Sequence, residues 1–224
     1  MRRAGSASWR FAEGIEQLPV VALYVRDAMG LAVPPGDPVP PRLDAVVPDR
    51  SGLLDAGQRF DAGAQWASWW SAVLANDIRM HRGAQDGVEQ SAWMRGLAGE
   101  ATELFDPPAF ASLNDRPGLR AAMRASFPEA LEWADQLRRT LLGPPHGRHG
   151  QFDYELIRTV AEQTAHQYRV SPDAVAACAV VLPVVGSWWY RCAPGAIVCS
   201  VHAAMDTVVA RAALADAFAS ALAD

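Results

Sequence analysis

The sequence predicts a mainly α-helical protein that carries one β-hairpin near its C-terminus. Apolar residues recur at helical spacing over much of the first 142 residues. A proline- and glycine-rich stretch, 143–151, then separates this part from the remainder. Further on, two β-prone runs flank Pro194-Gly195, a typical hairpin turn. We therefore expect a helical region over 1–142, a linker over 143–151 and a compact unit over 152–224.

The region 1–142 is expected to hold four or five helices. Helical spacing of apolar residues predicts helices over 10–30, with a kink or a new start at Pro19, over 61–80 and over 86–105. Residues 116–143 predict two helices joined near Phe127-Pro128, because proline disrupts a helix interior. Six prolines between residues 33 and 50 predict an extended arm.

The unit 152–224 is expected to begin with two helices and to end with another. The run 152–168 predicts the first helix, and SPDAVAACAVVL, 171–182, predicts the second, with Ser171 as its N-cap. After the hairpin, Ser200 or Asp206 opens a final alanine-rich helix that reaches about Leu222.

Residues 159–200 carry a recognisable order of features: a helix with Ala161 and Ala165, the turn Val170-Ser171, the second helix, Gly186 and the hairpin. In this order they resemble the winged helix-turn-helix of GntR-type transcription regulators. The resemblance implies that the second helix reads DNA in the major groove. Here that helix is degenerate, because beyond Ser171 and Asp173 it is apolar on every side and is expected to be buried.

Composition argues against several functions. All 20 basic residues are arginine, so Schiff-base chemistry on lysine and a P-loop lysine are excluded. The net charge of −5 disfavours phosphate binding, so DNA is not an expected partner. Three cysteines, the lack of an export signal and the lack of an apolar run of membrane-spanning length predict a reduced, cytoplasmic protein that makes no membrane contact.

Two aromatic clusters are the candidate partner-binding residues. The first is Trp66, Trp69 and Trp70, and the second is Trp188, Trp189 and Tyr190. Aromatic side chains dominate protein-binding hot spots, although core packing explains the same residues. The favoured interpretation is a non-enzymatic cytosolic adaptor or regulatory interaction protein that uses a winged-helix-like scaffold to bind a protein partner or a second copy of itself.

Two alternatives stay open: a winged-helix transcription regulator, and an enzyme of unrecognised type near Asp77 and His81. These two residues lie four apart on a predicted helix, where a carboxylate–imidazole pair can act as a general base. Cys192, Cys199 and His202 form a C-x6-C-x2-H pattern, and the hairpin is expected to place both cysteines on one face. That spacing matches no common zinc module, so zinc binding is left open and no cofactor, metal or catalytic residue is assigned.

Overall fold

The computed structural model describes residues 8–36, 38–85, 104–142 and 152–223. The protein is mainly α-helical and contains a four-stranded sheet that includes the predicted hairpin. Its helices are α1 (Gln17–Ala28), α2 (Ala56–Gln85), α4 (Pro117–Leu142), α5 (Tyr154–Tyr168), α6 (Val201–Met205) and α7 (Thr207–Ala221). Its strands are β1 (Arg10–Gly14), β2 (Ala176–Leu182), β3 (Trp189–Ala193) and β4 (Ala196–Ser200), and short 3-10 helices cover Ser51–Leu53, Ala111–Leu113 and Pro172–Ala174.

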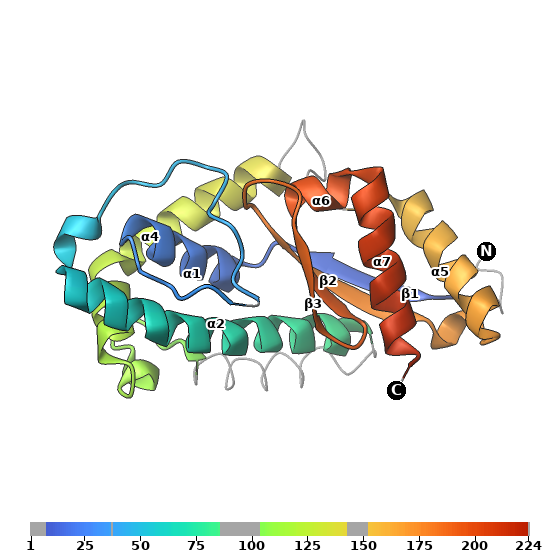
Figure 1. The fold of residues 1–224 in the computed structure, drawn as a ribbon, viewed down its shortest axis with the longest axis horizontal. Helices are drawn as coiled ribbons and strands as arrows, with labels where there is room; N and C mark the ends of the chain where they lie inside the picture. Colours follow the sequence, from blue (N-terminus) through green and yellow to red (C-terminus); the bar gives the residue numbers. More distant parts are fainter. Residues whose placement is uncertain (1–7, 37, 86–103, 143–151, 224) are drawn as a thin grey trace.

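The molecule is elongated, with a helical bundle at one end and the sheet at the other (Figure 1). Helices α1, α2 and α4 pack against one another in the bundle. The long helix α2 continues past the bundle and also packs against β1 and β2 of the sheet. Helix α7 contacts β2, β3 and β4, and α5 lies beside α7. None of the helices in the described ranges combines the length and the apolar character that crossing a bilayer requires.

The sheet joins the two ends of the sequence. Its strand order is β1-β2-β4-β3, with β1 and β4 parallel to β2 and β3 antiparallel to β4. Arg10 pairs with Ala176, so a strand from the first predicted part lies in the sheet of the second. The expected linker, 143–151, and most of the helix expected over 86–105 lie outside the described residues.

The helix expected over 171–182 is wrong, because Ala176–Leu182 form strand β2. Only Pro172–Ala174 are helical, as a single 3-10 turn. The run is apolar on every side because β2 is an interior strand with helices over both faces, and such strands have continuous apolar sequences. The residues that would correspond to the DNA-reading helix of a winged helix-turn-helix therefore form a strand in this protein.

Several other helix boundaries differ from the prediction, including those of α2, which covers Ala56–Gln85 where 61–80 was expected. Residues 10–14 form β1, and the first helix begins at Gln17. Residues 117–142 form one helix with Pro128 inside it, not two. Ser200 and Asp206 each cap a helix, through bonds to the amides of Ala203 and of Val208 and Val209, so the expected final helix is divided into α6 and α7.

The tryptophan cluster Trp66, Trp69 and Trp70 is part of the core, where each side chain is 0% exposed. Trp66 and Trp70 stack with their ring centroids 5.1 Å apart. The three indole N–H groups donate to carbonyl oxygens of Ala22 in α1, Leu104 and Pro38. The assignment of these three residues to partner binding is therefore corrected: they fasten α2 to its neighbours, and a partner has no access to them.

The proline-rich arm is held by Arg26, a buried residue of α1. Its guanidinium donates to the carbonyl oxygens of Pro40 and Pro41 at 2.6 and 2.7 Å and to the Asp27 carboxylate at 2.7 and 3.1 Å. It also lies 5.4 Å from the centre of the Trp66 ring. Asp27 in turn accepts a hydrogen bond from the Leu43 amide.

We expect Arg26→Met to destabilise the fold by about 3–5 kcal/mol, because it leaves the buried Asp27 carboxylate without its cation. The measurement is the free energy of unfolding in urea. The matched control is Arg50→Met, which removes an exposed arginine paired with Glu129. The control should leave the midpoint nearly unchanged. Equal loss in both variants would show that the arm does not depend on Arg26.

Candidate functional site: a groove between α2 and the edge strand β3

A groove of about 640 Å³ lies between helix α2 and strand β3. It arises because α2 crosses the sheet over β1 and β2, whereas β3 lies at the far edge of the sheet, beyond the helix. The volume lies within the range of ordinary ligand and peptide sites, roughly 300–1,000 Å³.

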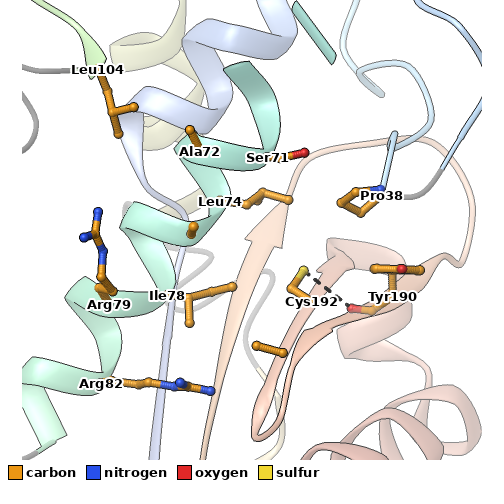
Figure 2. Close-up of a pocket in the computed structure, with 12 residues that line it drawn as sticks. Pro38, Ser71, Ala72, Leu74, Ile78, Arg79, Arg82, Leu104, Tyr190 and Cys192 are labelled. Atoms are coloured by element: carbon orange, nitrogen blue, oxygen red, sulfur yellow. Dashed lines mark hydrogen bonds between the residues drawn. The ribbon is translucent and has the colours of Figure 1, made fainter. Parts of the chain in front are cut away.

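The walls of the groove are mainly apolar. Leu74 and Ile78 point from α2 toward β3, and Tyr190 and Cys192 line the opposite wall, while Pro38 of the arm closes one end (Figure 2). The remaining lining residues are Ser71, Ala72, Ala75, Arg79, Arg82, Leu104 and Ala193. The groove is thus built from four segments that are far apart in the sequence: the arm at Pro38, helix α2, Leu104 and strand β3.

The cation at the other end of the groove is Arg82. Its side chain extends from α2 toward the hairpin (Figure 2), where it donates to the carbonyl oxygen of Pro194. Arg79 points away from β3 in the same view and lies 3.5 Å from the amide oxygen of Asn76. A guanidinium has five N–H donors, so Arg82 can bond Pro194 and an acidic group at the same time.

The surroundings of Cys192, the thiol that lines the groove, keep it protonated. Burial, with a smaller effect of the neighbouring Cys178, raises the pKa of Cys192 to about 12. Burial also raises the pKa values of Cys178 and Cys199. Because only the thiolate is a good nucleophile, Cys192 is a wall residue and not a catalytic group.

The expectation that Cys192 and Cys199 share one face of the hairpin is wrong. Cys192 lines the groove on the α2 side. Cys178 of β2 interacts with Arg82, so it faces α2. Val181 lies three residues further along β2 and faces the other way, and Cys199 pairs with Val181. Cys199 therefore lies on the face away from α2. A β-bulge between Arg191 and Ala193 disturbs the alternation on which the expectation depended. His202, the third residue of the pattern, lies 2.9 Å from the Asp44 carboxylate instead.

The second aromatic cluster is divided by the sheet. Trp188, Trp189 and Tyr190 are half-buried and pack against the core. Tyr190 lines the groove, and Trp189 points to the other face because neighbouring strand residues alternate. Leu74, Ile78 and Pro38 were not predicted as site residues, since no local pattern shows that four distant segments meet.

Asp77 and His81 are buried on α2, where they face the loop between β1 and α1 and do not line the groove. The groove therefore does not provide a substrate pocket for an enzyme that would use Asp77 and His81. Among the described residues, no group of three or more histidine, cysteine or acidic side chains has the arrangement needed to hold a metal ion.

Comparison with family models, with curated proteins and with solved structures gives no match for this chain.

We expect Cys192 to resist alkylation even though it lines an open groove. A thiol with a pKa of about 12 in place of 9.0 carries ~1,000-fold less thiolate at pH 8. The measurement is mass spectrometry of iodoacetamide-treated native protein, with urea-unfolded protein as the control in which all three cysteines react. Modification of native Cys192 at the rate of the unfolded chain would contradict the assignment.

Proposed function

We propose that this protein is an interaction module that binds an extended peptide segment of a partner protein along β3. The observation that supports this most directly is an edge strand beside an apolar groove. Within the described residues β3 pairs with β4 on one side only, so its other side offers backbone hydrogen-bonding groups to an added strand. Addition of a strand to a sheet edge, with side chains placed in an adjacent groove, is a common mode of peptide recognition.

The partner segment should combine apolar and acidic residues. An apolar side chain fits the wall formed by Leu74, Ile78 and Cys192, and an acidic side chain reaches Arg82 at the end of the groove. Residues on one face of a strand lie two positions apart, about 6.6 Å. A segment in which valine and glutamate alternate with outward-facing residues therefore satisfies both contacts.

The proposed function is still that of an interaction protein, but the proposed binding surface is the groove beside β3 and not the two aromatic clusters. Tyr190 keeps its assigned role, whereas the tryptophans in the core lose theirs. A cytoplasmic location is part of the proposal, supported by three cysteines that form no disulfide. The transcription-regulator alternative has less support, because the residues that were to read DNA form β2.

The test uses fluorescein-labelled octapeptides of the pattern Thr-Val-Thr-Glu and, as a matched probe, Thr-Val-Thr-Lys, each repeated twice. We expect the glutamate peptide to bind with micromolar affinity in fluorescence anisotropy and the lysine peptide to bind at least tenfold more weakly. Arg82→Gln should weaken the glutamate peptide about tenfold, which corresponds to about 1.4 kcal/mol. Ala75→Phe, which adds bulk to the exposed groove wall, should weaken both peptides.

The control variant is Phe60→Ala, which removes an exposed side chain of α2 outside the groove lining. It should leave peptide affinity unchanged. A glutamate peptide with alternate backbone amides methylated should fail to bind, since strand addition needs its N–H groups. Full affinity of the methylated peptide would show that the groove takes an acid without strand pairing. Equal binding to wild type and Ala75→Phe would place the binding surface elsewhere.

A further inference from the structure

Two titratable side chains, Glu16 and His81, meet where β1 ends, and Asp77 lies one helical turn before His81 on α2. Gly14 closes β1, Glu16 precedes α1, and His81 approaches from α2. A Cβ atom on Gly14 would lie 2.5 Å from Oε1 of Glu16, 2.9 Å from Cε1 of His81 and 3.5 Å from its Nε2. Glu16 and His81 therefore fill the space that a side chain at position 14 would need, and they approach each other across it.

Two polar atoms of this cluster have no hydrogen-bond partner within the described part of the chain. They are Oδ2 of Asp77 and Nε2 of His81, and both are closed off from solvent. Asp77 is 4% exposed and His81 is 8% exposed. Buried polar groups are nearly always hydrogen-bonded, so two unpartnered atoms four residues apart on one helix call for a physical explanation.

The burial of these atoms restricts what can reach them. The described residues here lack the arrangement that a metal ion requires. A molecule of ordinary size has no access to atoms that are closed off from solvent. A proton, by contrast, reaches buried histidines through brief local openings.

We propose that Glu16, Asp77 and His81 form a proton-operated latch between the β1–α1 loop and helix α2. When His81 is neutral, it packs beside Glu16 and the start of α1 is held against α2. When His81 takes up a proton, burial disfavours the charge, Glu16 offsets only part of this cost, and the start of α1 is held less firmly. The proton comes from solvent and returns to it, so no other reactant is needed.

The remaining charged groups near the latch are engaged elsewhere. On α4, Arg138 donates to the carbonyl oxygen of Ile15, and the Asp135 carboxylate accepts from the side-chain amide of Gln17. On β1, Glu13 accepts from the backbone amide of Phe152. Arg82 of α2 extends to the hairpin. Glu16 is therefore the carboxylate that faces His81 from the opposing loop.

The direction of the pH response follows from the two buried groups. Burial lowers the pKa of His81 below its ordinary 6.5, and the charge of Glu16 opposes this. The unfolded chain therefore takes up the His81 proton first. Stability falls as the pH drops below 6.5 and levels off once folded His81 has also titrated. Burial, with a smaller effect of Glu16, raises the pKa of Asp77. The stability from protonated Asp77 is present at low pH and is lost as the pH rises through that raised pKa.

The experiment follows the imidazole carbon resonances of His81 by NMR in the full chain between pH 4 and 8. The test variant is Glu16→Gln, which is suitable because Glu16 makes no side-chain capping bond to α1. The matched control is His166→Gln, which removes an exposed histidine from α5. Hydrogen exchange of the first amides of α1, corrected for intrinsic pH dependence, reports whether the loop is fastened.

We expect wild-type His81 to titrate below 6.5 and Glu16→Gln to shift its midpoint further down. Protection of the first α1 amides should fall as wild-type His81 takes up its proton. That fall should be larger in Glu16→Gln, which removes the charge that partly offsets burial of the imidazolium, and unchanged in His166→Gln. A His81 midpoint that does not move in Glu16→Gln would overturn the proposal. So would α1 protection that is independent of His81 protonation.

Discussion

Arg26 holds a positive charge inside the protein, and four hydrogen bonds replace the water that this charge has lost. Two of these bonds reach the carbonyl oxygens of Pro40 and Pro41. The prolines of this segment have no N–H groups, so they cannot donate hydrogen bonds to these oxygens themselves. The arm is thereby held against α1, and its Leu43 forms a β-bridge with Val184, just beyond β2. Pro38, which closes one end of the groove, owes its position to the same anchoring and to the indole of Trp70.

The length of α2 explains why the groove and the titratable cluster are neighbours. One half of the helix packs in the bundle, and the other half covers β1 and β2. Within the second half, Leu74 and Ile78 face the uncovered edge strand, whereas Asp77 and His81 face the loop before α1. A helix turns about 100° per residue, so one segment presents an apolar wall and a buried polar pair to different surroundings.

The sequence predicts the helical class, the hairpin at Pro194-Gly195, helix α5 and the caps at Ser200 and Asp206 well, because each depends on local spacing or on one residue's chemistry. It fails at Ala176–Leu182, since a short apolar run buried on all sides has no period that separates a helix from an interior strand. The groove also escapes prediction. Tyr190 belongs to a predicted aromatic cluster, but its meeting with Arg82 and Pro38 depends on strand order, which no local pattern encodes.

The parallel pairing of β1 with β2 constrains the order in which the protein can form. Arg10 must find Ala176, and β2 in turn must find β4 at Ala196–Ser200, so the sheet closes only after most of the chain has been synthesised. Bundle helices α1, α2 and α4 have their contacts available earlier. The bundle can therefore pack before the sheet closes, and until β1 pairs with β2 the end of α2 that covers these strands keeps an uncovered apolar face.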